Sequence, residues 1–152
     1  MIILTIFACS QGTGVPAHPQ EVLGVTLGGS LEELEAVYNK NRLALQKASK
    51  DSYVSEGAVK PLAGLPEVEI NYQIVLGVLH VVEVIFKGDV SDELQALLDE
   101  KYSVDPVLRQ QLEQKQRFIG TIGKNDHYWL LPDMAVMVIV QGGETRLVYS
   151  LK

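Results

Sequence analysis

The side chains of this sequence that can act as nucleophile, general base or metal ligand are few and widely separated. The chain of 152 residues has one cysteine, Cys9, and three histidines, His18, His80 and His127. A single cysteine cannot form an internal disulfide, and metal sites and catalytic nucleophiles usually show short local spacings or motifs. No G-x-S-x-G motif occurs in the sequence. We therefore expect no catalytic residue, no metal site and no cofactor.

Two of the histidines have neighbours that invite a functional interpretation. Asp126 precedes His127 and would suit the partner that orients a general base, but Asn-Asp-His after a glycine is ordinary turn chemistry. We interpret His127 as a turn residue. His80 lies in an apolar stretch with β-branched neighbours, which predicts a partly buried, hydrogen-bonded histidine in a strand.

Cys9 is the one residue for which the surroundings suggest a specific covalent role. It ends an apolar run that contains only Thr5 as a polar residue, and a polar tract from Ser10 to Gln20 follows. Ile6-Phe7-Ala8-Cys9 resembles a bacterial lipobox, in which the cysteine thiol takes a lipid after an export signal. The alternative is that residues 2–8 form a buried strand, with Cys9 as a small core residue.

The domain prediction follows from this division of the chain. We expect residues 1–21 to be an export signal remnant and polar tether, and residues 22–152 to form a single domain. The chain is acidic, with 13 Lys and Arg against 19 Asp and Glu and a net charge of −6. Because nucleic-acid binding needs clustered cations, we expect no nucleic-acid partner. No apolar stretch approaches the roughly 20 residues of a membrane span, so we expect membrane contact only through a lipid.

Helices are predicted at three places by caps and by periodicity. Ser30 with Glu33 forms a capping box that begins a helix of four to five turns at Leu31. Ser91 is the expected N-cap of a second one-sided helix. A further short helical stretch is expected over Val107–Gln116.

The clearest strand signal is the alternation from Glu67 to Ile74, which predicts that Val68, Ile70, Tyr72 and Ile74 face a core. Leu79–Phe86 is the expected hairpin partner, and a short strand is expected around Tyr53. Four more strands are predicted over Arg117–Ile122, Tyr128–Leu131, Met134–Val140 and Thr145–Leu151.

These elements predict an α+β fold. The order is helix, strands, helix, strands, in two units over about residues 22–88 and 89–152. One-sided strands joined by short hairpins exclude a doubly wound parallel sheet, whose strands are apolar on both faces. We expect the helices to pack on one side of a curved antiparallel sheet.

Several of these segments together resemble a known group of proteins. They are Leu27-Gly-Gly-Ser-Leu-Glu-Glu-Leu, Leu62-Ala-Gly-Leu-Pro, Leu79 to Phe86, and Leu94 to Pro106 ahead of Trp129. Over residues 22–151 the chain resembles small exported bacterial proteins with helix-then-sheet repeats, including outer-membrane assembly lipoproteins and the β-lactamase-inhibitor-like fold. Ser103 departs from this pattern, because a glycine is expected there. The resemblance implies a non-enzymatic binding or assembly role in the periplasm or at the outer membrane, with another envelope protein as partner.

The partner-binding residues are open at this stage. Tyr128 and Trp129 are adjacent in a predicted strand, so one faces the core and the other is the aromatic candidate for a partner contact. Two alternatives to a binding module also stay open. One is a small enzyme whose site assembles only in three dimensions, and the other is a cytosolic regulatory domain that uses residues 2–8 as a strand.

Overall fold

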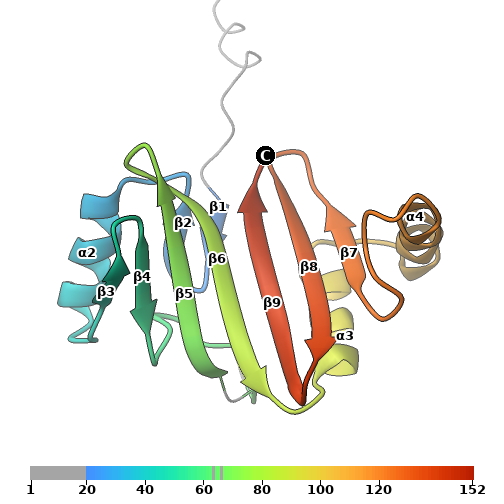
Figure 1. Ribbon diagram of the computed structural model, residues 1–152, viewed down its shortest axis with the longest axis horizontal. Coiled ribbons are helices and arrows are strands. Elements are labelled where there is room, and N and C mark those ends of the chain that lie inside the picture. The colour runs from blue at the N-terminus through green and yellow to red at the C-terminus, as the bar shows by residue number, and fades with distance from the viewer. Residues whose placement is uncertain (1–19, 63, 66) are drawn as a thin grey trace, which may run out of the picture.

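The fold is organised around one antiparallel sheet. The computed structural model describes residues 20–62, 64–65 and 67–152, without the side chain of residue 68. Seven strands pair in the order β3-β4-β5-β6-β9-β8-β7, and β1 and β2 form a separate two-stranded sheet (Figure 1). The predicted α+β class, with an antiparallel sheet and helices on one side of it, is therefore confirmed. Cys9 and residues 2–8 lie outside the described residues.

The elements have the following bounds. The helices are α2 (Leu31–Lys40), α3 (Ser91–Lys101) and α4 (Pro106–Phe118). The strands are β1 (Gln20–Val22), β2 (Val25–Leu27), β3 (Gln46–Ser49), β4 (Ser52–Ser55), β5 (Glu67–Val75), β6 (Val78–Lys87), β7 (His127–Leu130), β8 (Met134–Gln141) and β9 (Glu144–Leu151). Among the described residues, no helix is long and apolar enough to cross a membrane.

The two helix-plus-sheet units meet at the pairing of β6 with β9, in the middle of the sheet. Strands β3 to β6 continue the sheet to one edge, and β8 and β7 continue it to the other. The last strand of each unit is therefore central, while the first strand that each unit contributes to this sheet, β3 or β7, is an edge strand. Figure 1 shows both edges, with α4 beside β7.

The core lies between one face of the sheet and the elements packed on it. Leu34 and Tyr38 of α2 and Leu94 and Leu98 of α3 join one buried cluster with the inward side chains of the strands. The predicted inward set of β5 is confirmed for Ile70, Tyr72 and Ile74, all of which are buried. Within this core the hydroxyl groups of Tyr38 and Tyr72 lie 2.5 Å apart, and Tyr38 donates to the carbonyl of Gly57. Both buried hydroxyls therefore have a hydrogen-bond partner, as burial requires.

Helix α2 begins as predicted but is shorter. The Ser30 side chain accepts from the Glu33 amide at 3.1 Å, which confirms the cap. The helix ends at Lys40 because the chain turns at Arg42, whose φ of +57° leaves the right-handed region. Ser103, where a glycine was expected, also has a left-handed φ of +53° just after α3.

Other sequence predictions were wrong in detail. Residues Arg117–Ile122 do not form a strand, because α4 continues to Phe118 and the Ile119 amide still donates to the carbonyl of Lys115. Ser91 is the first residue of α3, not its N-cap, and the Asp89 carboxylate accepts from both its amide and its hydroxyl. Strands β1 and β2, of three residues each, were not predicted, and β3 was missed because the helix predicted from Leu31 over four to five turns reaches into its residues.

The turn between β5 and β6 has an unusual residue at its tip. Val75 pairs with Val78, so Leu76 and Gly77 are the two turn residues, with φ values of +52° and +79°. Two positive φ values define a type I′ turn, whose first position favours asparagine because that side chain tolerates left-handed backbone. Leu76 occupies this position while 97% exposed.

We predict that Leu76→Asn stabilises the fold. A leucine in the left-handed region costs about 1 kcal/mol or more, and asparagine relieves most of this cost. Urea unfolding of the variant should give a free energy of unfolding higher by about 0.5–1 kcal/mol. Leu76→Ala removes the same exposed side chain without relieving the backbone, so it should give no comparable gain; equal gains in both variants would contradict the explanation.

Candidate functional site

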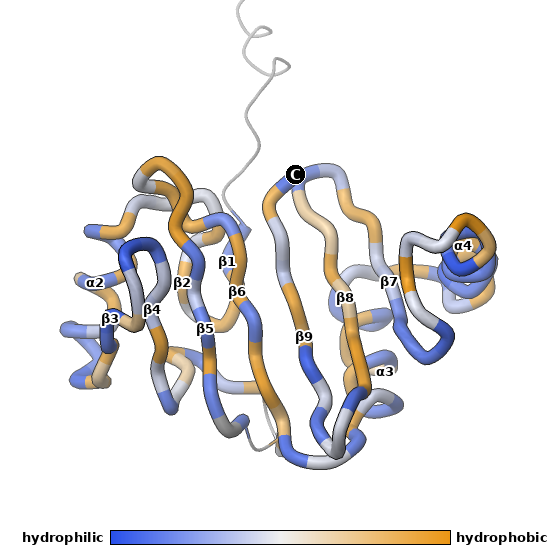
Figure 2. Tube along the Cα trace, in the orientation of Figure 1, coloured by the Kyte–Doolittle hydropathy of each residue, from blue (hydrophilic) through white to orange (hydrophobic). Residues whose placement is uncertain are grey.

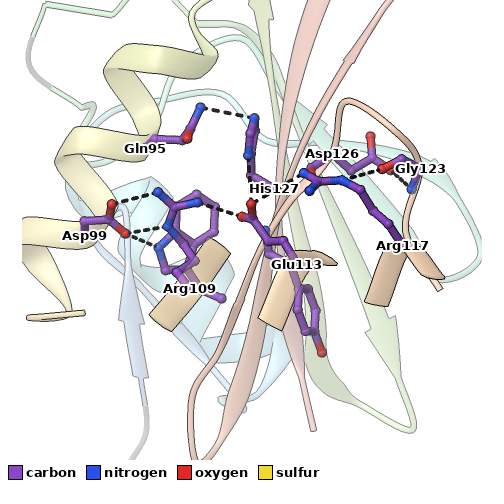
Figure 3. Close-up of polar contacts among 10 residues, drawn as sticks. Gln95, Asp99, Arg109, Glu113, Arg117, Gly123, Asp126 and His127 are labelled. Atoms are coloured by element: carbon purple, nitrogen blue, oxygen red, sulfur yellow. Dashed lines mark hydrogen bonds and ion pairs between the residues drawn. The ribbon is translucent and has the colours of Figure 1, made fainter. Parts of the chain in front are cut away.

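Two features of the described residues stand out as candidate sites: a buried cluster of charged side chains and a sheet face without a cover. The charged cluster lies where α3, α4 and β7 meet (Figure 3). Its centre is Arg109 and Glu113 on α4, whose side chains are 3% and 2% exposed. Charged side chains are rarely buried to this extent unless they are paired, so the partners decide what the cluster does.

Arg109 is held by two carboxylates and an aromatic ring. Its Nε and Nη2 donate to the two oxygens of Asp99 on α3 at 2.8 and 2.9 Å, and its Nη1 donates to Glu113 at 2.7 Å. The guanidinium carbon also lies 4.9 Å from the ring centroid of Trp129. Trp129 Nε1 donates to Asp99 at 2.8 Å, so the ring is fixed by the same carboxylate. The two-oxygen contact uses the planar geometry of arginine, which a lysine cannot reproduce.

Glu113 accepts hydrogen bonds from four residues. Besides Arg109, its oxygens accept from the Tyr128 amide at 2.9 Å, from Arg117 at 3.4 Å and from His127 Nδ1 at 3.3 Å. Burial raises the pKa of Glu113, but the hydrogen bonds from His127, Tyr128 and Arg109 outweigh it and lower the pKa to about 2. Glu113 is therefore a carboxylate throughout the neutral range.

The same contacts cover part of the outer edge of β7. The Tyr128 amide points away from β8 to Glu113, and Arg117 donates to the carbonyl of Asp126 at 2.6 Å. Side chains of α4 thus take the place that a neighbouring strand would occupy. An uncovered strand edge is a template for unwanted pairing, and α4 protects this one.

His127 is a strand residue of this cluster, so its interpretation as a turn residue was wrong. Its Nδ1 contacts Glu113, and its Nε2 lies 3.1 Å from the amide nitrogen of Gln95. A neutral imidazole with its proton on Nδ1 satisfies both contacts. Asp126 does not orient this ring; its carboxylate accepts from the Gly123 amide at 2.7 Å. The ring and the carboxylates are thus occupied by protein partners, and the cluster anchors α4 and β7.

His80 lies half-buried in strand β6, as predicted, but its place in the strand is irregular. The pairing of β5 with β6 shifts between Ile74–Leu79 and Gln73–Val81, so His80 is the extra residue of a bulge. A bulge interrupts the regular alternation of side chains along the strand. The ring is half-buried, and its Nδ1 has no hydrogen-bond partner among the described residues.

The second candidate is the sheet face opposite the helices. Figure 1 is viewed onto this face, and no described helix or strand lies over it. The strand registers arrange its side chains in three rows across the sheet. The rows are Gln73, Val81, Ser150, Ala135 and Leu130; then Asn71, Glu83, Val148, Met137 and Tyr128; then Glu69, Ile85, Arg146 and Ile139.

This uncovered face is polar on β5 and apolar toward β7. The rows begin with Gln73, Asn71 and Glu69 and end with aliphatic or aromatic side chains on β7 and β8. Figure 2 shows the difference along the trace, since hydropathy alternates along β5 but stays apolar along β8. We call the seven apolar side chains of the rows between β6 and β7 that are not fully buried the apolar patch: Val81, Tyr128, Leu130, Ala135, Met137, Ile139 and Val148.

The structure answers which of the two adjacent aromatic residues faces the core. Trp129 is 1% exposed and belongs to the core cluster, whereas Tyr128 is half-buried on the uncovered face. Tyr128 is therefore the aromatic candidate for a partner contact, and the backbone amide of this residue is fixed by Glu113.

Sequence reasoning missed both sites, although signals for them exist. In α4 the pair Arg109 and Glu113 has the i, i+4 spacing of an ion pair. The apolar residues Val107, Leu108 and Phe118 lie near the ends of this helix and are all exposed, so they do not mark its buried side. In β8 the run from Met134 to Val140 is apolar at odd and even positions alike. A strand with one wet face would alternate, so this run indicated a second apolar face.

Comparisons with protein-family models, curated proteins and solved structures found no match for this chain.

Proposed function

We propose that this protein is a non-enzymatic binding module of the bacterial cell envelope that is tethered by a lipid on Cys9. The observation that carries the binding half is the apolar patch on a face that no described element covers. Large exposed apolar patches are uncommon on monomeric proteins and mark interaction sites. Tyr128 at the end of the middle row adds an aromatic side chain of the kind that anchors interfaces.

The charges around the apolar patch indicate the chemistry of its partner. Glu83 pairs with Arg146 at 3.2 Å, and Arg146 also contacts Glu144 at 3.5 Å, so the one cation of the three rows is neutralised. Glu69 and Asn71 border Glu83 on the other side, where Asn71 donates to both carboxylates. The polar half of the face is therefore acidic. It suits a protein partner that has an apolar centre and lysine or arginine side chains beside it.

The charged cluster supports this function indirectly. It holds α4 against β7, and β7 carries Tyr128 and Leu130 at the end of the apolar patch. Binding to a rigid surface avoids the cost of ordering it. The cluster thus positions binding residues without itself contacting the partner.

An enzyme with a site assembled in three dimensions is the alternative. A hollow of about 380 Å³ is lined by Val54, Ser55, Glu56 and Glu69 among others. The Ser55 hydroxyl lies 2.9 and 3.0 Å from the carbonyls of Ala44 and Gly57 and is not directed to a base. We favour the binding module because a nucleophile needs an adjacent base.

The tether is tested by metabolic labelling. In a bacterial host with lipoprotein processing enzymes, labelled palmitate should appear on the wild-type chain and in the envelope fraction. The Cys9→Ala variant should carry no label. Unlabelled wild-type protein, or wild-type protein in the cytosolic fraction, would contradict the tether.

Deletion of residues 1–19 separates the tether from the alternative of an N-terminal buried strand. We expect the deletion to shift the thermal midpoint by less than about 2 °C, because a tether contributes no buried apolar surface. Loss of a strand over residues 2–8 would unfold the domain or lower the midpoint by many degrees. Differential scanning calorimetry of both proteins gives the comparison.

A further inference from the structure

The β5–β6 turn combines a strained backbone with an exposed apolar side chain. Leu76 is 97% exposed at a φ of +52°, and neighbouring Val75 is 45% exposed. An asparagine at this position would relieve the backbone and suit water better. Strained backbone conformations are often found at functional positions.

The turn is held firmly in place. The Gly77 carbonyl accepts from the amide of Leu31 at 3.2 Å, where α2 begins, and β5 and β6 pair up to the turn. Leu76 is therefore presented at the end of a fixed hairpin and does not collapse onto the domain.

The β5–β6 turn lies at the same end of the strands as the start of the described chain. The Gln20 side chain donates to Asp133 in the β7–β8 turn, and the amide of Lys152, the last residue, donates to the carbonyl of Asp133. Figure 1 shows the β5–β6 turn, the β7–β8 turn and the C-terminus at one end of the sheet, at the top of the view. Ser10 to Pro19, the residues between Cys9 and Gln20, span at most about 35 Å when fully extended. A lipid on Cys9 would therefore keep this end of the sheet near the membrane.

We propose that Leu76 and Val75 at the tip of the β5–β6 turn insert into the surface of the lipid bilayer to which Cys9 is tethered. This inference rests on the proposed tether. The tether keeps the tip close to the bilayer, so a small apolar contact suffices. Insertion orients the domain with its turns toward the membrane and leaves the uncovered face perpendicular to it, open to a partner.

The test measures membrane partition with a defined tether. Cys9 is the only cysteine of the chain, so alkylation of the full-length protein with tetradecyl maleimide places one acyl chain there. A single chain of this length binds membranes reversibly, which makes a second contact measurable. Sedimentation with vesicles of phosphatidylethanolamine and phosphatidylglycerol should show a partition coefficient about tenfold lower for Leu76→Asn than for wild type.

Leu108→Asn is the matched control, because Leu108 is 62% exposed on α4, beside the sheet. Its partition should stay within about twofold of wild type. As a second readout, brominated lipid should quench Leu76→Trp fluorescence but not that of Trp129, which is 1% exposed, or of Gln141→Trp at the end of β8, beside the β8–β9 turn. Equal partition of Leu76→Asn and wild type, an equal loss in both asparagine variants, or an unquenched Leu76→Trp would overturn the proposal. A failed palmitate experiment would remove the natural tether but would leave these vesicle results unchanged, so the two failures are distinguishable.

Discussion

Replacing Arg109 with methionine is expected to lower the free energy of unfolding by about 3–5 kcal/mol, the cost of removing one partner from a buried ion pair. Methionine has a similar volume and leaves no large cavity. It does leave the carboxylates of Asp99 and Glu113 without the guanidinium that pairs with both. Urea unfolding at pH 7, followed by circular dichroism, measures this change.

Lys115→Met is the control for the Arg109 prediction. Lys115 is exposed on the same helix, so its loss should change the free energy of unfolding by less than about 0.5 kcal/mol. A loss below about 1 kcal/mol for Arg109→Met would mean that water reaches the cluster and that α4 is not anchored by it.

Acid is expected to destabilise the fold through Glu113. Its folded pKa of about 2 lies below the unfolded value near 4.5, so its contribution is complete above pH 4.5 and is lost as the pH falls toward 2. The contribution amounts to about 3 kcal/mol at 1.4 kcal/mol for each pKa unit. Asp99 acts in the same direction, since its hydrogen bonds from Arg109 and Trp129 outweigh burial and lower its pKa.

Glu113→Gln isolates this contribution. The variant should be less stable than wild type at pH 7, because Arg109 loses one carboxylate, but its stability should fall less steeply between pH 4.5 and 2. Urea unfolding at several pH values gives both slopes. Parallel slopes for the two proteins would show that Glu113 does not titrate with a lowered pKa.

The architecture was predictable because its signals are local. The alternation from Glu67 to Ile74 and the Ser30 cap depend only on neighbouring residues, and both are present in the structure. The hairpin of β5 and β6 and the meander of β8 and β9 follow from short turns between apolar strands. The short strand over Ser52–Ser55 was also placed correctly around Tyr53.

The candidate sites were not predictable in the same way because they depend on distant residues. Asp99 and His127 contact α4 residues 10 and 14 positions away, and only the packing of α4 beside β7 brings them together. The residues of the apolar patch come from four strands of both units. Glutamines and charged residues make α4 resemble a fully solvated helix, although its inward side is the charged one. Phe118 and Ile119 then suggested a strand where the helix continues.

The two sites have a common consequence for the edge strand β7. The buried charges of α4 satisfy the Tyr128 amide and the Asp126 carbonyl, while the Tyr128 side chain points to the uncovered face. The edge of β7 is thereby closed to strand pairing at these positions, and the face beside it stays open. A partner is expected to dock on the side chains of the face.

Photo-crosslinking in the intact envelope tests the binding face most directly. A photoreactive benzoylphenylalanine replaces Met137 in the apolar patch, or Glu35 on the exposed side of α2 as a control. We predict one discrete protein adduct from position 137, no adduct from position 35, and loss of the adduct when Ile139→Asp places a charge in the patch. Equal adducts from both positions, or an adduct at position 137 that persists in the Ile139→Asp variant with its fold intact, would contradict the assignment of the uncovered face as the binding site.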